Sequence, residues 1–318
     1  MEKSKKLNLI GMLFLFLATI AWGSSFLILK NTIEHVPGFF VISVRFFAAA
    51  IILGVIFFKR LIKINKQSLV CGILLGLSVA FAYFTQTWGL KYTTPARNAF
   101  ITSTYCVMTP FLYWIMFRHK PTRYNVFAAI ICLTGIGMIS LLGGQGEEGE
   151  NLLLGDGLTL ISAVFYALQI VFIDKFQKDG VDPMSLLVIE FLCVGVVLAG
   201  AWAIFELPST GITAILNIEW KQWLSIIYLT LSCTLFAQFA QVIGQRYANP
   251  NQSAIILSLE AVFGALFSVL FGAEKLTVFL VIGFVLTFSS VMINEYKLDP
   301  IKLFCKKNKH TVEENKKV

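Results

Sequence analysis

The stretch FTQTWGLKYTTPARNAFI at Phe84–Ile101 decides the fold, because it recurs as FAQVIGQRYANPNQSAII at Phe239–Ile256. At this offset of 155 residues, seven of the 18 positions are identical, and a Gly and a Pro are among them. Lys91 is matched by Arg246, which preserves a positive charge. Gly and Pro mark the ends and starts of helices rather than their interiors. The chain is therefore predicted to contain an internal repeat whose copies interrupt their helices at the same place.

The repeat lies in a chain that is far more apolar than a soluble protein. Of its 318 residues, 57% are hydrophobic and 14% are charged, and the mean hydropathy is +0.77. Soluble domains are about 45–50% apolar and about 25% charged. This composition excludes a disordered chain and argues against a soluble globule. Ten apolar runs are each close to the length that crosses a bilayer as a helix, about 20 residues. The predicted spans are Leu9–Leu29, Gly38–Phe58, Leu69–Leu90, Ala99–Phe117, Tyr124–Leu142, Gly155–Phe176, Ser185–Phe205, Trp223–Ile243, Ser253–Gly272 and Leu276–Asn294.

Each copy of the repeat holds five of these spans, and Gly11 lies over Gly155 near the two starts. Because five is odd, the second copy must cross the membrane in the opposite sense. Inverted repeats are typical of secondary transporters, whose substrate site lies near the midplane at the repeat interface. Duplication for packing alone is the alternative. The sequence predicts an all-α integral membrane protein of ten transmembrane helices, with repeats at 9–142 and 152–295 and a basic tail at 296–318.

The positive charges predict the orientation of the chain. Short segments on one side of the predicted spans hold 20 of the 26 Lys and Arg residues, and the other side holds five. Cytoplasmic loops carry such an excess, so both termini are predicted to lie in the cytoplasm, in a multi-pass protein of the cell membrane. The acidic loop at Glu147–Glu150 is then outside. Short basic clusters do not form the continuous face that nucleic acid requires, and no nucleic-acid partner is predicted.

The first apolar run has an alternative as a signal peptide, because it follows Lys3, Lys5 and Lys6 and contains small residues. Two features count against this alternative. The run is long for the apolar part of a signal peptide, and its counterpart in the second copy is internal.

Three motifs resemble those of EamA-type transporters, in the drug/metabolite transporter superfamily. AWGSSF at Ala21–Phe26 resembles the Trp-Gly-Ser motif of the first span, and RFFAAA at Arg45–Ala50 resembles the start of the second. SLEAVFGAL at Ser258–Leu266 resembles the ninth-span pattern, with Ala261 where that pattern has Pro. The resemblance implies two EamA-like five-helix repeats, with the first four helices of each half around a central cavity and the fifth and tenth peripheral. It also implies export of amino acids, metabolites or drugs.

Three ionisable residues lie inside predicted spans, where a charge costs about 2.5–3.5 kcal/mol at the helix centre. Arg45 is predicted to bind substrate, while Glu260 and Glu190 are predicted to sense a proton or cation. Interhelical pairing and snorkelling are the alternatives. The full set predicted to contact substrate is Trp22, Ser24, Ser25, Arg45, Tyr83, Gln86, Tyr105, Tyr166, Gln169 and Gln241. Further candidates for the same cavity are Trp88, Asn98, Thr102 and Gln238. For each polar residue, hydrogen bonding between helices is the alternative role.

The chain lacks the motifs of an enzyme. It has no Gly-x-x-x-x-Gly-Lys-Ser/Thr, no His-Glu-x-x-His and no Gly-x-Ser-x-Gly. No catalytic residue, metal site or cofactor is predicted. The predicted function is secondary active export of a small organic metabolite, such as an amino acid, by alternating access. Cationic drug efflux, and a membrane-embedded lipid-handling protein, are the alternatives. The predicted partners are a small-molecule substrate, the lipid bilayer and protons, and a homo-oligomer is left open.

Overall fold

The computed structural model describes residues 2–62, 64–118, 120–138, 151–248, 250–273, 275 and 277–296, and these residues are helical or in short turns, without a strand. The first half contains α1 (Glu2–Ile33), α2 (Gly38–Ile56), α3 (Phe58–Leu61), α4 (Lys66–Leu90), α5 (Pro95–Thr102), α6 (Tyr105–Phe117) and α7 (Arg123–Gly137). The second half contains α8 (Leu152–Lys178), α9 (Pro183–Ala201), η2 (Trp202–Glu206), α10 (Leu207–Thr210), α11 (Thr213–Leu216), α12 (Trp220–Tyr228), η3 (Leu229–Phe236), α13 (Ala237–Tyr247), α14 (Pro250–Leu270) and α15 (Val278–Tyr296).

Seven helical segments of the described chain are long and apolar enough to cross a membrane. They are Lys6–Ile33, Gly38–Ile56, Lys66–Leu90, Pro95–Phe117, Leu152–Lys178, Pro183–Thr210 and Trp220–Tyr247. Two apolar helical segments are shorter, Ile256–Leu270 and Val281–Ser290. The all-helical membrane architecture follows the sequence prediction, and the count of ten spans stays a prediction. The acidic loop, the end of the fifth predicted span and the basic tail after Tyr296 lie outside the described residues.

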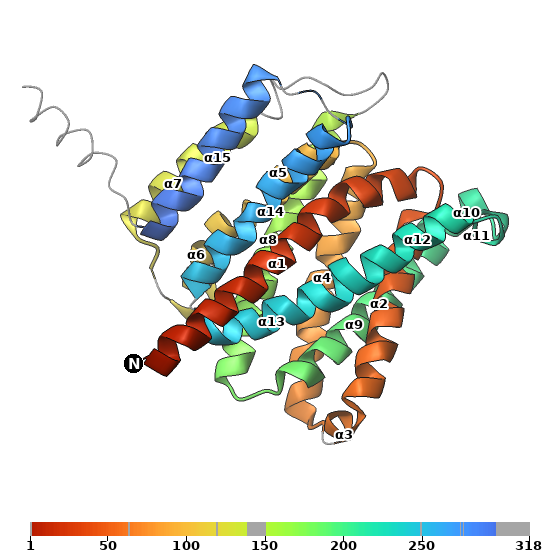
Figure 1. Ribbon diagram of the computed structural model, residues 1–318, viewed down its shortest axis with the longest axis horizontal. Helices are drawn as coiled ribbons and strands as arrows, with labels where there is room; N and C mark the ends of the chain where they lie inside the picture. The colour runs from red at the N-terminus through yellow and green to blue at the C-terminus, as the bar shows by residue number, and fades with distance from the viewer. Residues whose placement is uncertain are drawn as a thin grey trace, which may run out of the picture.

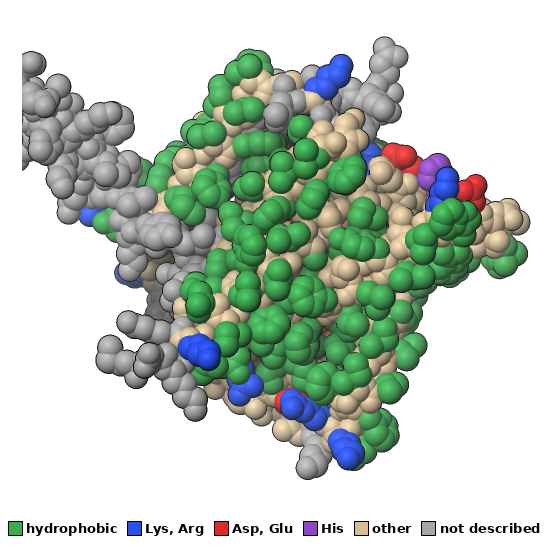
Figure 2. Space-filling view, in the orientation of Figure 1, with side chains coloured by type: hydrophobic (Ala, Val, Ile, Leu, Met, Phe, Trp, Pro, Cys, Tyr) green, Lys and Arg blue, Asp and Glu red, His purple; other side chains and the backbone are tan. Residues whose placement is uncertain are grey.

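The surface of the helices is apolar across the middle of the molecule. In Figure 2 hydrophobic side chains cover the centre of the face, and Lys and Arg gather at the end that holds the N-terminus. Val55, Ile115 and Val278 are each at least 69% exposed. Apolar side chains in this position suit lipid, and helices satisfy their own backbone hydrogen bonds there. The exposed apolar surface is therefore interpreted as the surface that contacts lipid.

The helices pack in pairs that repeat between the two halves. α4 packs along α8, and α1 packs along α13. α1 also packs along α14, as α8 packs against α5 and α6. α2 pairs with α9, and α7 pairs with α15 at one edge of the bundle (Figure 1). The sequence match relates α1 to α8, α4 to α13, and α5 and α6 to α14. Each contact between two helices thus has a counterpart between the two matching helices.

Two pairs of helices approach each other through repeat-matched glycines. At the α4–α8 crossing, a Cβ on Gly89 would lie 2.7 Å from the carbonyl oxygen of Gly155. At the α1–α13 crossing, a Cβ on Gly11 would lie 3.0 Å from the carbonyl oxygen of Gly244. Only a residue without a side chain lets two backbones come this close. The glycines singled out by the sequence match are therefore points where the backbones of the two halves come into close contact.

Two of the predicted spans that line the candidate site are interrupted where the sequence predicts continuous helices. The fourth divides into α5 and α6 at Ser103 and Thr104, whose hydroxyls donate to the carbonyl oxygens of Ala99 (3.0 Å) and Ile101 (2.7 Å). Such side-chain bonds compete with the helical ladder. The eighth passes through the π-helical η3 between α12 and α13. Both interruptions lie in the part of the bundle that surrounds the candidate site.

Candidate functional site

The interior of the bundle contains one cavity that gathers most of the predicted site residues. It is lined from α1, α2, α4, α5, α6, α8, α13 and α14. The lining residues are Trp22, Ser25, Phe26, Leu29, Arg45, Tyr83, Gln86, Leu90, Asn98, Thr102, Tyr105, Tyr166, Gln169, Ile170, Gln238, Gln241, Leu257 and Glu260. In the described chain, α7 and α15 contribute nothing to the lining, as the family resemblance implies for the fifth and tenth helices.

Arg45 supplies a positive charge that the surrounding protein satisfies only in part. The side chain projects from α2 and is 1% exposed. Its Nε donates to Thr234 Oγ1 at 3.0 Å, and its guanidinium lies 5.9 Å from the centre of the Tyr83 ring. Its Nη1 has no hydrogen-bond partner. An unpaired buried donor on a cation is costly, so Nη1 is suited to bind an anionic group that enters the cavity.

Glu260 supplies the negative charge of the cavity. It projects from α14, is 4% exposed, and its Oε1 lies 3.4 Å from Ser103 Oγ, whose shorter hydrogen bond is to the Ala99 carbonyl at 3.0 Å. The Tyr105 side chain faces the same carboxylate. Within the described residues, Glu260 forms no ion pair with Lys or Arg. The carboxylate has only neutral neighbours and is suited to an ammonium group or a proton.

Glu190 lies one side chain away from the cavity rather than in its wall. This residue of α9 is fully buried, and its Oε1 accepts from Gln169 Nε2 at 3.4 Å. Gln169 also donates to Gln238 Oε1 at 3.0 Å, and both Gln side chains line the cavity. Glu190 Oε2 has no partner. Glu190 and Arg45 do not pair in the described structure, and Glu190 reaches the cavity only through Gln169.

The repeat-matched glutamines differ in how far the protein satisfies them. Gln86 Nε2 donates to Thr102 Oγ1 at 3.0 Å, and Gln86 Oε1 accepts from the Tyr166 hydroxyl at 2.8 Å. Gln241 Oε1, by contrast, is buried without a partner. Gln86 is therefore held by the cavity wall, while the Gln241 acceptor is left unused by the described protein groups.

Aromatic side chains form much of the remaining wall. Tyr166 contacts Tyr83 edge-on, with ring centres 5.7 Å apart, and also contacts Tyr105 at 6.4 Å. Trp22 donates from Nε1 to the Cys233 carbonyl at 2.8 Å, and Ser25 Oγ donates to the Trp22 carbonyl at 2.7 Å. These rings give the cavity a rigid and largely apolar lining around a few polar groups, as is typical of small-molecule sites.

Besides Glu190, two of the predicted residues lie outside the cavity. Ser24 bonds the Tyr228 hydroxyl at 2.7 Å and the Ala21 carbonyl at 2.8 Å, so its hydroxyl is used between α1 and α12. Trp88 packs against Phe39 and Phe205 instead. In a helix that packs on several neighbours, adjacent residues face different partners, and composition alone does not say which of them face the cavity.

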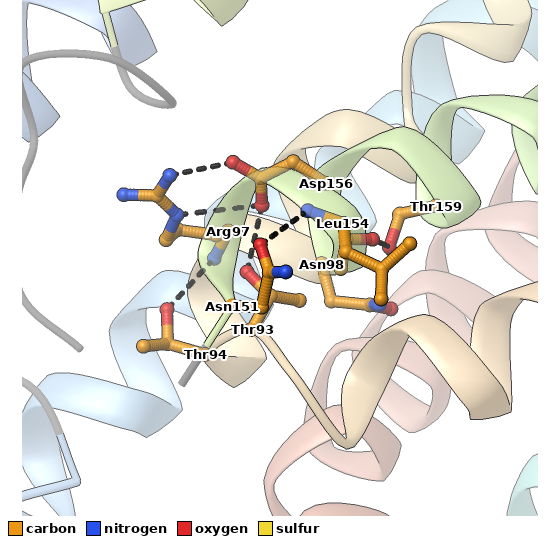
Figure 3. A network of polar contacts seen from close by, with 9 residues as sticks. Thr93, Thr94, Arg97, Asn98, Asn151, Leu154, Asp156 and Thr159 are labelled. Carbon is orange, nitrogen blue, oxygen red and sulfur yellow. Dashed lines mark hydrogen bonds and ion pairs between the residues drawn. The ribbon is translucent and has the colours of Figure 1, made fainter. Parts of the chain in front are cut away.

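A polar network closes the end of the bundle at the α4–α8 crossing, and sequence reasoning missed it. Arg97 Nη2 pairs with Asp156 Oδ2 at 2.5 Å, and the side chains are 2% and 5% exposed (Figure 3). Thr93 Oγ1 donates to Asp156 at 2.7 Å, and Asn98 Nδ2 donates to Thr159 Oγ1 at 2.7 Å. The predicted spans leave Arg97 in the loop before the fourth span, which is wrong because the residue lies in the first turn of α5 and is buried against α8.

Two lysine side chains also form polar contacts at this end of the bundle, which we call the Gly89 end. Lys30 Nζ donates to the carbonyl oxygens of Leu90 and Thr93, each at 3.1 Å. Lys91 pairs with Glu206 at 2.6 Å. The Glu206 carboxylate also accepts from two backbone N–H groups of the first turn of α2, at 3.0 and 2.8 Å. A carboxylate at a helix N-terminus is favourable because it satisfies free N–H groups and the helix dipole.

A bundle of membrane-length apolar helices around a buried polar cavity defines a multi-pass membrane protein of the transporter class. The EamA-like transporter family model matches residues 9–141 and 153–295, and the chain belongs to this family, in the drug/metabolite transporter superfamily. A relative in Archaeoglobus fulgidus, named an uncharacterized transporter, is 30% identical over 263 residues, which are 83% of this chain and 78% of that protein.

Other similarities agree with this assignment. A relative in Salmonella typhimurium, named a probable amino-acid metabolite efflux pump, is 26% identical over 293 residues, which are 88% of this chain and 93% of that protein. One solved crystal structure superimposes with a TM-score of 0.64 over 91% of this chain and 96% of that chain, at 19% identity. The last similarity concerns the fold alone.

Proposed function

We propose that the chain is a secondary active transporter that exports a small zwitterionic metabolite of the amino-acid class by alternating access. One observation carries this proposal. A single buried cavity presents an Arg45 N–H without a hydrogen-bond partner and a Glu260 carboxylate that forms no ion pair with the described Lys and Arg residues. An amino acid has a carboxylate for the first and an ammonium for the second. Its binding would neutralise both charges without further residues.

The relatives support transport of this class. The Salmonella relative is named for amino-acid metabolite efflux, and export is the direction we propose for this chain. The aromatic and aliphatic wall, which includes Tyr166 and Leu257, suits an apolar side chain on the solute. We therefore expect neutral amino acids to bind in preference to charged ones.

The packing supports an alternating-access mechanism between two inverted five-helix halves. α4 packs along α8 as α1 packs along α13, and repeat-matched glycines meet at both crossings. In this mechanism one crossing opens while the other stays closed, and the cavity faces each side of the membrane in turn. Lys and Arg at the N-terminal end in Figure 2 support an orientation with both termini in the cytoplasm of a cell membrane.

The proposal is tested by reconstitution of the purified full chain in liposomes. Counterflow of labelled L-leucine is measured first, with the remaining neutral amino acids as competitors. Leucine counterflow that Arg45→Gln and Glu260→Gln each reduce at least tenfold supports the proposal. An imposed proton gradient should accelerate efflux by the unaltered protein and not by Glu260→Gln. Absence of counterflow for every amino acid would contradict the proposal.

Cationic drug efflux is the second candidate, and the site offers one observation in its favour. Tyr83, Tyr105, Tyr166 and Trp22 surround a carboxylate, and aromatic faces attract organic cations. Quaternary ammonium compounds are the discriminating competitors in the same assay. Competition by these cations that persists in Arg45→Gln would favour drug efflux over amino-acid export.

A further inference from the structure

The π-helical segment η3 forms hydrogen bonds to two cavity-lining side chains, one from α1 and one from α2. It lies between α12 and α13 and packs against both α1 and α2. Trp22 of α1 donates from Nε1 to the Cys233 carbonyl at 2.8 Å, and Arg45 of α2 donates from Nε to Thr234 Oγ1 at 3.0 Å. Two adjacent residues of one segment thus contact two cavity residues on two different helices.

The π-helical register explains why η3 can make these contacts. In an α-helix each carbonyl accepts from the N–H four residues later, whereas a π-helix shifts this bond to the fifth residue. The Thr234 hydroxyl follows the wider register, since it donates to the Leu229 carbonyl, five residues earlier, at 3.1 Å. Its oxygen keeps lone pairs, which accept the Arg45 N–H. π-helical turns often lie at functional sites for this reason.

The same register sets the direction of the residues that follow. One additional residue in a helical turn rotates all later side chains by about 100° around the axis. α13 continues from η3, and its Gln238 and Gln241 both face the cavity. The segment is buried where it makes these contacts, as Cys233 and Thr234 are both fully buried.

We propose that η3 is the positioning element of the substrate site, and that Thr234 is its specificity-determining residue because it orients Arg45 toward the carboxylate of the solute. Thr234 does not line the cavity, so it acts through Arg45. Its hydrogen bond restricts rotation of the guanidinium and leaves Nη1 as the free donor. A fixed donor loses less conformational freedom when it binds an anion. This inference rests on the proposed function.

A matched control exists within the same segment. Thr230 is also buried in η3, and its hydroxyl donates at 2.7 Å to the Ile226 carbonyl of its own helix. Replacement of either Thr by Val removes a hydroxyl and preserves the branched shape. Only the Thr234 replacement removes the acceptor of Arg45 Nε. Thr234→Ser restores an oxygen at that position and serves as the rescue variant.

The experiment measures counterflow of L-leucine, and its competition by isopentylamine, in liposomes that contain the full chain. Isopentylamine is leucine without its carboxylate. We expect Thr234→Val to raise the KM for leucine about tenfold with little change in maximal rate, and to leave competition by isopentylamine unchanged. Thr230→Val and Thr234→Ser should resemble the unaltered protein. Thr234→Ala replaces Thr234→Val if the valine variant does not reach the membrane.

Each alternative outcome has a distinct meaning. An unchanged KM in Thr234→Val, together with a raised KM in Arg45→Gln, overturns the positioning role and leaves the proposed function standing. Equal losses for leucine and isopentylamine in Thr234→Val overturn it as well, because they indicate a structural role. Absence of any effect in Arg45→Gln contradicts the proposed function itself.

Discussion

The α4–α8 crossing and the α1–α13 crossing are built from matched glycines but are secured differently. At the Gly89 end, a buried ion pair between Arg97 and Asp156 joins α5 to α8 (Figure 3). At the opposite end, the Asn8 side chain donates to the Tyr247 carbonyl at 3.1 Å. No ion pair joins α1 to α13 among the described residues. The two halves therefore share their backbone contacts, while their charges have diverged.

This difference indicates which end opens more readily. Separation of α5 from α8 requires the exposure or loss of a buried ion pair, which is costly when one partner is left alone. Among the described contacts, separation of α1 from α13 requires the loss of one exposed hydrogen bond, which contributes little net stability. We therefore expect the Gly89 end to separate less readily than the α1–α13 crossing. Variants that equalise the two ends test this comparison.

The largest effect is expected from Asp156→Asn. This change leaves the Arg97 cation buried without its partner, and we expect the free energy of unfolding to fall by about 3–5 kcal/mol. The measurement is denaturant-induced unfolding of the purified protein in detergent. Asp179→Asn is the control at the other end of α8, where Lys175 and Asp179 form a pair whose side chains are 44% and 36% exposed. Its expected loss is below about 1 kcal/mol, and equal losses in both variants would contradict the comparison.

A smaller effect is expected from an added methyl group at the crossings. A Cβ at Gly89 meets the Gly155 carbonyl at 2.7 Å, so the backbones must separate. A Cβ at Gly244 meets Leu15 Cγ at 2.6 Å and the Gly11 carbonyl oxygen at 3.0 Å, so its backbone contact is looser than that at Gly89. We expect Gly89→Ala to lower the free energy of unfolding by about 1–3 kcal/mol and Gly244→Ala to lower it by less. The reverse order in the same unfolding experiment would show that the α1–α13 crossing is the more rigid of the two.

The smallest effect is expected from Asn8→Ala. The hydrogen bond to the Tyr247 carbonyl is exposed, and its loss should lower the free energy of unfolding by about 1 kcal/mol or less. Increased labelling of residues near Gly11 by a water-soluble thiol reagent, after single cysteines are introduced there, would show opening of this end. A loss of several kcal/mol would place this end on a par with the Gly89 end.

The sequence predicts the architecture well because lipid imposes simple rules. Apolar runs of membrane length become helices, and Gly89 and Gly155, marked by the repeat, become points of helix contact. Intramembrane charges are costly, and of the three that this rule selects, Arg45 and Glu260 line the cavity while Glu190 lies one side chain behind its wall. The roles of all three in binding and coupling stay predictions.

The sequence does not predict which polar residues pair across the bundle. Arg97 and Asp156 lie 59 residues apart, and neither has a local pattern that names the other. The π-helical register of η3 depends on contacts with α1 and α2 rather than on its own composition. Ser24 and Ser25 look equivalent in sequence, but only Ser25 faces the cavity. These features depend on packing between helices, which periodicity does not encode.

The central claim is that one cavity binds both charges of a zwitterion, the carboxylate at Arg45 and the ammonium at Glu260. The most direct measurement is binding of three ligands to the purified protein: L-leucine, isopentylamine without the carboxylate, and 4-methylpentanoate without the ammonium. The unaltered protein should prefer leucine to both analogues by at least about tenfold. Arg45→Gln should lose only the preference over isopentylamine, and Glu260→Gln only the preference over 4-methylpentanoate. Preferences that stay the same in both variants would contradict the claim.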